Sequence, residues 1–169
     1  VYVHKIAIAY DFLRKGIFRR VQQLRDAGHD IPINEHIRAF FDQNNTIDDL
    51  LSLTDTTVLH EIQCWSRYED AILQDLCAMF LFRKKFKIIN CTYQDVSVER
   101  LREETAKHYD PDFFFGHIKI PIKILQTPIF VEIDGEQRQL EEVSDLIRFY
   151  TQQNWYVEYV LLPRDLSVA

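Results

Sequence analysis

The chain has 169 residues, enough for one domain or two small ones with a buried core. Its composition, 47% hydrophobic and 27% charged with only 4 Gly and 5 Pro, is that of a globular protein and excludes collagen-like and low-complexity classes. The net charge of −6 comes from residues 91–169, because Lys/Arg and Asp/Glu balance in residues 1–90, and this distribution argues against binding duplex nucleic acid through a broad basic face.

Cysteine usage and hydropathy predict a cytoplasmic protein. Cys64, Cys77 and Cys91 are odd in number and have no CxxC spacing, which predicts free, buried thiols in a reducing compartment. No apolar run reaches the roughly 18 residues that a membrane span needs, so we expect no membrane partner.

The first half of the sequence is predicted to be helical. Apolar residues recur at steps of three or four from Tyr2 to Leu24, which predicts one long amphipathic helix, and Gly28 follows at the position of a C-cap. Shorter amphipathic helices are predicted at residues 34–43, 46–53, 54–68 and 69–82, which makes about five. Side chains suited to helix starts are Asn34, as an N-cap, and the pair Thr46 and Asp49, in capping-box positions.

After residue 82 the pattern changes to short segments typical of strands, interrupted by helices. In chain order these are a strand in "KFKII", a helix at 97–109, strands at 113–125 and 128–140 with Asp134-Gly135 as a hairpin turn, a helix at 141–153 and a strand at 155–163. The predicted fold class is therefore α+β, a helical half followed by a small β-β-α-β unit. The predicted domains are residues 1–90, a helical segment, and residues 91–169, a small C-terminal domain.

The first chemical hypothesis is a metal site of the HD phosphohydrolase kind. Such a site needs a His, a His-Asp pair and a distant Asp on packed helices, and the sequence offers His4 and His29-Asp30. However, His29-Asp30 falls in a helix-ending turn, and His4 is a whole helix away, roughly 35 Å at 1.5 Å per residue. The remaining histidines have no ligand spacing: His36, His60, His108 and His117. No metal site is predicted in this sequence.

The sequence also lacks the motifs of covalent catalysis. The sequence contains no GxSxG, no cysteine beside a recognisable base and no Gly-rich phosphate loop, so no catalytic residue is predicted. Paired acids fall in predicted first turns or exposed faces, where they complement the helix dipole or face solvent: Asp48-Asp49, Glu103-Glu104 and Glu141-Glu142.

Two basic clusters remain as candidate binding sites. "RKKFK" places Arg83, Lys84, Lys85 and Lys87 around Phe86, where a helix gives way to a strand. Two interpretations stay open for it: a solvated helix end, or a triphosphate clamp, since Arg offers a planar fork and Lys a point charge. The second cluster lies on the polar side of the first helix and is interpreted as a solvated face or a subunit contact: Arg14, Lys15, Arg19, Arg20 and Arg25.

Three stretches follow one another in the order found in a known family: "YVHK" opening a helix, "TIDDLLSLTDTTVLHEIQCW" and "FLFRKKFKII". Together they resemble the HD-domain deoxynucleoside triphosphate triphosphohydrolases, a family that includes the vertebrate SAM-and-HD-domain enzyme and bacterial relatives. The resemblance covers most of residues 1–90, and "EEVSDLIRF" and "YVLLPRD" are similar to the tail of the bacterial HD phosphohydrolases.

The resemblance implies roles for particular residues. Tyr2 matches a tyrosine that lines the substrate pocket, and His4 and Lys5 match a pair that contacts the phosphates of an activating nucleotide at a subunit junction. Arg83 and Lys87 match the basic residues of the family's Arg-x-x-Phe-Lys, which belong to the same regulatory region.

The resemblance also implies an incomplete enzyme. In this family the metal ligands precede the Tyr-x-His-Lys helix, so we expect a C-terminal regulatory and oligomerisation region, inactive on its own, with the divalent metal in an upstream catalytic domain. The implied partners are a nucleotide, dNTP or GTP, and further copies of the chain. Val3 and Ile8 depart from the family's residues at the regulatory site.

The alternative hypothesis is a ligand-free protein–protein interaction module. In that case the basic clusters pair with acidic faces, such as those of residues 132–145 in a neighbouring chain, and tune the choice of partner more than stability.

Overall fold

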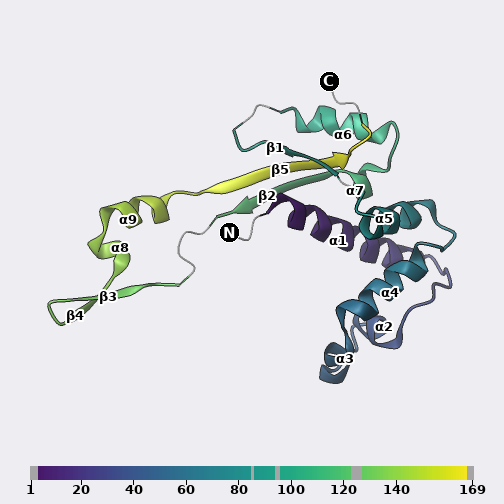
Figure 1. The fold of residues 1–169 in the computed structure, drawn as a ribbon, viewed down its shortest axis with the longest axis horizontal. Coiled ribbons are helices and arrows are strands. Elements are labelled where there is room, and N and C mark those ends of the chain that lie inside the picture. The colour runs from purple at the N-terminus through teal and green to yellow at the C-terminus, as the bar shows by residue number, and fades with distance from the viewer. Residues whose placement is uncertain (1–3, 85, 94–95, 123–126, 167–169) are drawn as a thin grey trace. The chain divides into compact units, whose positions relative to one another are not determined.

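A computed structural model describes residues 4–84, 86–93, 96–122 and 127–166 (Figure 1). The protein is of mixed α+β class, as predicted, with helices concentrated in the first half. In chain order the elements are α1 (Lys5–Asp26), α2 (Glu35–Phe41), α3 (Ile47–Ser52), α4 (Asp55–Trp65), α5 (Ala71–Leu81), β1 (Phe86–Asn90), α6 (Val98–Ala106), α7 (Pro111–Phe114), β2 (Gly116–Pro121), β3 (Phe130–Ile133), β4 (Glu136–Gln139), α8 (Leu140–Val143), α9 (Asp145–Gln152) and β5 (Tyr156–Pro163).

Local capping chemistry sets the boundaries of the first helices. Gly28 follows α1 with a φ of 85°, a left-handed conformation that glycine adopts without a steric cost. The side chain of Asn34 accepts a hydrogen bond from the backbone N–H of His36 at the start of α2. Thr46 and Asp49 form the expected capping box of α3.

Two details of the second half differ from the prediction. The residues expected to begin a strand at 113 form α7 instead, because Asp110 caps its N-terminus and Pro111 occupies the first helical position. The single helix expected at 141–153 is two helices, because Ser144 is extended, ends α8, and accepts a hydrogen bond from the N–H of Ile147 as the N-cap of α9.

The strands form two separate sheets. β5 lies between β1 and β2 in a three-stranded sheet, and β3 pairs with β4 in an antiparallel hairpin. In the hairpin, Phe130 is opposite Gln139 and Ile133 is opposite Glu136. Asp134 and Gly135 have φ values of 53° and 82°, so the predicted turn residues supply the positive φ that a tight hairpin turn requires.

The chain divides into two compact units that interleave along the sequence. Unit 1 comprises residues 1–88, 97–116 and 161–169, and unit 2 comprises residues 89–96 and 117–160. The compact units do not coincide with the predicted domains, residues 1–90 and 91–169, because α6, α7 and the end of β5 group with the first five helices. The domain boundary between residues 90 and 91 stays a prediction.

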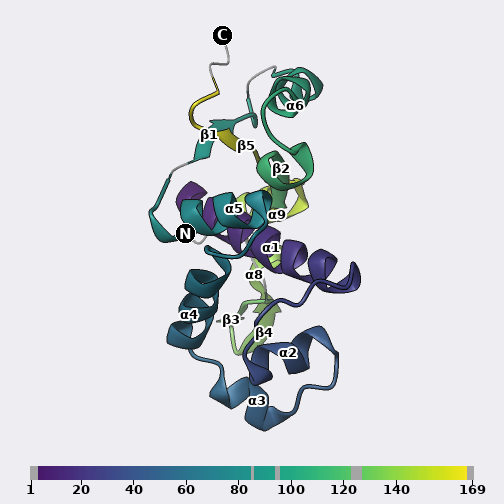
Figure 2. The ribbon, with the colours of Figure 1, turned by 90° about the vertical axis from the view of Figure 1, so that its right-hand side faces the viewer.

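Unit 1 has a well-formed core around α1 and α5, which lie side by side in both ribbon views (Figures 1 and 2). Its fully buried side chains include Ile17, Val21, Ile62, Trp65, Leu73 and Leu76. Arg20 of α1 donates two hydrogen bonds to the carboxylate of Asp70, at 3.0 and 2.7 Å, and these bonds are the main cause of the lowered pKa of Asp70. Asp70 also caps α5, so one carboxylate fixes both the start of α5 and its position on α1.

Unit 2 has almost no core of its own. Among its described residues Val160 alone is buried. In the part of the chain that the structure describes, no helix combines the length and the apolar character required to cross a membrane.

Candidate functional site

A hollow of about 900 Å³ in unit 1 brings together cations that lie far apart in the sequence. Lys5 comes from the first turn of α1, and Arg83 and Lys84 follow the end of α5. We call this site the basic hollow. Its remaining lining residues are aliphatic or aromatic and come from α1, α4, α5 and β1: Ile6, Ala9, Tyr10, Leu13, Leu59, Phe80, Leu81, Phe86 and Ile88.

The end of α5 determines how Arg83 and Lys84 are presented. The N–H of Lys84 bonds to the carbonyl of Met79 at 3.1 Å, which closes the helix in a Schellman motif. Arg83 has a φ of 51°, at the position that glycine usually occupies in this motif. A large side chain in this conformation is uncommon and strained, and such residues cluster at functional sites.

The cations of the basic hollow have no acidic partner in the described structure. Within the described residues, no carboxylate lies within 4 Å of Lys5, Arg83 or Lys84, and no acidic residue lines the hollow. Their charge is therefore available to an anion. An apolar wall beside them suits a ligand that is anionic at one end and apolar or aromatic at the other.

The cluster on the polar side of α1 behaves differently. Its members are engaged within the chain: Arg14 and Lys15 with Asp11 at 2.6 and 2.7 Å, Arg20 with Asp70 at 2.7 Å, Arg25 with Asp42 at 2.5 Å, and Arg19 with the carbonyl of Asp112. Arg19, Arg20 and Arg25 thus connect α1 to other segments of unit 1, a role that the pattern of charges alone did not indicate. Arg14 and Lys15 form ion pairs within α1.

Two other residues implied by the resemblance, His4 and Lys87, do not line this hollow. Tyr2 lies outside the described residues. The exposed His4 is the N-cap of α1, and its Nδ1 accepts a hydrogen bond from the N–H of Ile6 at 3.4 Å. Lys87 is half-buried in β1 between Phe86 and Ile88, and since alternate residues of a strand face opposite sides, it lies on the other face from these two. The binding roles of all these residues stay predictions.

Lys84 and Tyr10 also line the basic hollow. Lys84 belongs to the basic cluster for which a triphosphate clamp is one interpretation, although the resemblance gives it no role. Tyr10 gave no such signal, because its position depends on how α1 packs against α5.

A second hollow, of about 620 Å³, shares Arg83 and Lys84 with the first but is of mixed charge. Arg164 adds a third cation, whereas Asp75 and Asp165 add two carboxylates. The hydroxyl of Tyr109 donates a hydrogen bond to Asp165 at 2.6 Å, and this bond, with burial, raises the pKa of Tyr109 to about 12. The acids make this hollow a poorer site for a polyanion than the basic hollow.

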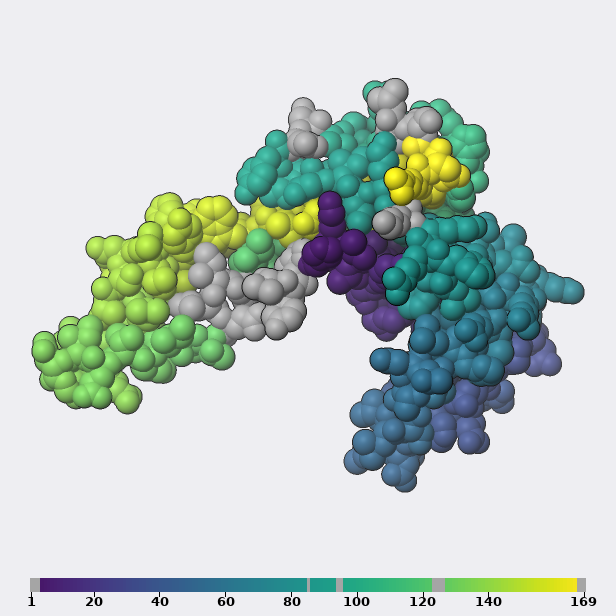
Figure 3. Space-filling view, viewed as in Figure 1, coloured from purple at the N-terminus to yellow at the C-terminus, as the bar shows by residue number. Residues whose placement is uncertain are grey.

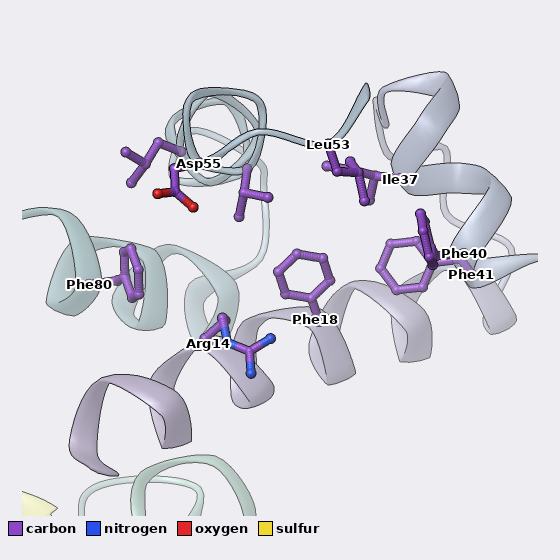
Figure 4. Close-up of a pocket in the computed structure, with 10 residues that line it drawn as sticks. Arg14, Phe18, Ile37, Phe40, Phe41, Leu53, Asp55 and Phe80 are labelled. Atoms are coloured by element: carbon purple, nitrogen blue, oxygen red, sulfur yellow. The ribbon is translucent and has the colours of Figure 1, made fainter. Parts of the chain in front are cut away.

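A third hollow, of about 650 Å³, is almost entirely apolar (Figure 4). The ring of Phe18 points into it, with Phe80 on one side and Phe40 and Phe41 on the other. Arg14 and Asp55 are its polar lining residues, and Arg14 is already paired with Asp11. Asp55 has no cation within 4 Å in the described residues, so the charge that this hollow offers is negative and does not suit a polyanion.

The described residues do not fit an HD-type metal site. They contain no group of three or more His, Cys, Asp or Glu side chains placed to hold a metal ion. His4 and His29 lie at opposite ends of α1, a helix of 22 residues that spans about 33 Å at 1.5 Å per residue. We therefore derive no chemistry through a metal held by these residues.

The three cysteines are free, and one of them has a neighbouring base that the sequence pattern did not indicate. Burial raises the pKa of Cys77 to about 12 and also raises the pKa of the half-buried Cys91. Cys64 is half-buried, and its Sγ lies 3.6 Å from Nε2 of His60, one turn earlier on α4. The i, i+4 spacing of these two residues was the available signal.

No protein-family model matches the chain. A stretch of 92 residues is 32% identical to the uncharacterized protein YwfO of Bacillus subtilis strain 168, covering 53% of this chain and 21% of that protein. The crystal structure of a phosphohydrolase from Bacteroides thetaiotaomicron matches with a TM-score of 0.77 and 20% identity, over 97% of this chain and 46% of that one. The chain has the fold of part of a phosphohydrolase. It spans about a fifth of the curated relative and less than half of the solved chain.

Proposed function

We propose that the chain is the C-terminal regulatory and oligomerisation region of a metal-dependent HD-domain phosphohydrolase that acts on deoxynucleoside triphosphates or related nucleotides. The observation that carries this proposal is the basic hollow, in which Lys5 and Arg83 line one cavity with no carboxylate beside them. The fold shared with part of a phosphohydrolase supports it. The divalent metal and the hydrolytic residues belong, in this proposal, to a catalytic domain outside this sequence.

The chemistry of the hollow suits a nucleotide. Arg83 offers a planar fork of N–H donors to phosphate oxygens, and Lys5 and Lys84 add point charges. The rings of Tyr10, Phe80 or Phe86 provide an apolar surface on which a base packs. The ligand binds with its phosphates at the rim and its base against the wall.

Titration calorimetry with dGTP or dATP tests the site. We expect saturable heat with the wild type and weaker binding after Lys5→Ala or Arg83→Asn, by about 1.5–3 kcal/mol each if the contacts are desolvated. Asn tolerates the positive φ at residue 83, so this variant removes the charge without adding strain. Arg67→Ala is the matched control, because Arg67 is exposed and does not line the basic hollow.

Lys87→Ala separates two versions of the site. A loss of affinity as large as that of Arg83→Asn supports the arrangement implied by the resemblance, in which Lys87 contacts phosphate. An unchanged affinity confines the site to the basic hollow, where Lys87 is absent. No heat at millimolar nucleotide rejects a nucleotide site formed by this chain.

The chain by itself is expected not to hydrolyse nucleotides. Chromatographic analysis of dNTPs incubated with the purified chain and Mg²⁺ or Mn²⁺ should show no product above the protein-free reaction. Metal-dependent release of triphosphate or phosphate that follows the chain through purification would contradict the assignment of catalysis to a separate domain.

The alternative, a ligand-free interaction module, is favoured by the exposed apolar side chains of unit 2, among them Phe130, Leu146 and Phe149. Size-exclusion chromatography with and without dNTP discriminates between the two functions. A change in the size of the oligomer on adding nucleotide, by growth or by dissociation, supports the regulatory role. An oligomer whose size does not change with nucleotide supports the interaction module.

A further inference from the structure

Residues 129–152, which we call the arm, expose apolar side chains on β3, α8 and α9. The arm comprises β3, β4, α8 and α9 and is the light-green part of the space-filling view (Figure 3). Phe130 is 57% exposed, and Leu146 and Phe149 of α9 are 64% and 56% exposed. Exposed apolar residues gathered in this way indicate a surface that another protein covers.

The arm is also acidic. It carries six acids and two arginines, and both arginines are paired inside it: Arg138 with Glu136 at 2.9 Å and Arg148 with Asp145 at 3.0 Å. In the described part of the chain, the other four acids have no cation within 4 Å: Glu132, Asp134, Glu141 and Glu142. The partner of this surface must therefore combine apolar contacts with positive charge.

The basic hollow has the complementary properties. Its walls are apolar, its rim carries Lys5, Arg83 and Lys84, and no acidic residue lines it. A contact between two arms would instead bring together two surfaces of the same charge, which is unfavourable. Charge therefore selects the hollow over a second arm as the partner of the arm.

We propose that the arm of one copy of the chain docks into the basic hollow of a second copy. The apolar side chains of the arm pack against the walls of the hollow, and its unpaired carboxylates lie against the rim. Because each copy carries both surfaces, two copies can make the contact twice and close a symmetric pair. The rim cations are those proposed to hold nucleotide phosphates, so arm and nucleotide compete for them, but docking of the arm does not depend on nucleotide binding.

Charge reversal on each surface tests the pairing. By sedimentation velocity the wild-type chain should form dimers, and either Glu132→Lys with Glu141→Lys, or Lys5→Glu with Lys84→Glu, should weaken the dimer at least tenfold. A 1:1 mixture of the two double variants should restore dimers, because the reversed arm of one meets the reversed rim of the other. Arg67→Glu with Arg100→Glu is the matched control and should leave the dimer unchanged, since both residues are exposed outside the hollow.

The variants are chosen to preserve folding, which circular dichroism checks. Lys5 is exposed in the first turn of α1, where a glutamate complements the helix dipole, and Glu132 is exposed on the hairpin. A second route avoids charge altogether: Leu146→Ser with Phe149→Ser removes apolar contacts from an exposed face and should also weaken the dimer at least tenfold.

Three results overturn the proposal: a wild type that stays monomeric up to millimolar concentration, a dimer that neither double variant weakens, or a mixture that restores nothing. If the mixture restores no dimer, but one chain that carries all four changes does form dimers, the arm contacts the hollow of its own copy. Nucleotide titration of the arm variant separates this proposal from the proposed function. A dimer without nucleotide binding defeats only the proposed function, and nucleotide binding by a permanent monomer defeats only the arm contact.

Discussion

At the scale of single residues, Asp49 shows how one carboxylate serves two helices. One of its oxygens lies 2.9 Å from Nδ1 of His36 in α2, and the other accepts the N–H and hydroxyl of Thr46 at the start of α3. These bonds lower the pKa of Asp49 from 3.8 to about 2, and the bond to His36 makes the largest contribution. A carboxylate that is ionised more readily in the folded state stabilises that state at pH values above its ordinary pKa.

The sign of the pH effect follows from this shift. The stabilisation by Asp49 is complete above about pH 4 and is lost as the pH falls through about 2, the folded-state pKa. We expect Asp49→Asn to lower the unfolding free energy at pH 6 and to make it less sensitive to acid between pH 4 and 2. Urea unfolding across that range measures the difference. Asp48→Asn, which removes the same charge from the same helical turn, is the control, and equal acid sensitivity in both variants would refute the role of Asp49.

At the scale of secondary-structure elements, two glycines have opposite surroundings. A Cβ built on Gly16, in the middle of α1, meets only Leu76, at 3.6 and 3.7 Å, which is ordinary contact. A Cβ on Gly116, at the start of β2, meets Phe12 at 3.0 Å and Leu161 at 3.1 Å, which is tighter than most Cβ contacts in proteins. Alanine therefore fits α1 as it stands, whereas in β2 it requires Phe12 and Leu161 to shift by a few tenths of an ångström.

The two alanine variants should change stability in opposite directions. Gly16→Ala should stabilise the protein by up to about 1 kcal/mol, because alanine has the higher helix propensity. Gly116→Ala should destabilise it by about 1–3 kcal/mol through overpacking. Thermal and urea unfolding of both variants provide the test, and a stabilising Gly116→Ala would show that Phe12 moves aside freely.

The same scale explains which elements the sequence could predict. Helix limits marked by local capping, such as Gly28 and Asn34, were predicted correctly because capping depends only on neighbouring residues. The break at Ser144 and the short helix at Pro111 have local signals too, but stretches of apolar residues across them indicated longer elements. The resemblance alone selected Lys5, whereas the basic cluster and the resemblance both selected Arg83. Their meeting at one hollow could not be predicted, because it depends on the packing of α1 against α5.

At the scale of the whole molecule, the two units differ in how much of their surface they bury. Unit 1 contains all of the fully buried large side chains except Val160. Local stability follows buried apolar contacts, so segments with few of them open at low free energy and exchange their amide hydrogens early. Unit 2 is therefore expected to open without unfolding unit 1.

Hydrogen exchange read by mass spectrometry tests this division. In dilute solution, where a dimer dissociates, the amides of the arm should exchange at least tenfold faster than those of α1 and α5, because α9 buries no residue whereas α1 buries Leu13, Ile17 and Val21. Raising the protein concentration should slow exchange in the arm much more than in α1 and α5, because the buried amides of these two helices are already protected in a single chain. Equal protection of arm and core in dilute protein would mean that the arm is covered within a single chain, and the missing core of unit 2 would then be supplied by the same copy.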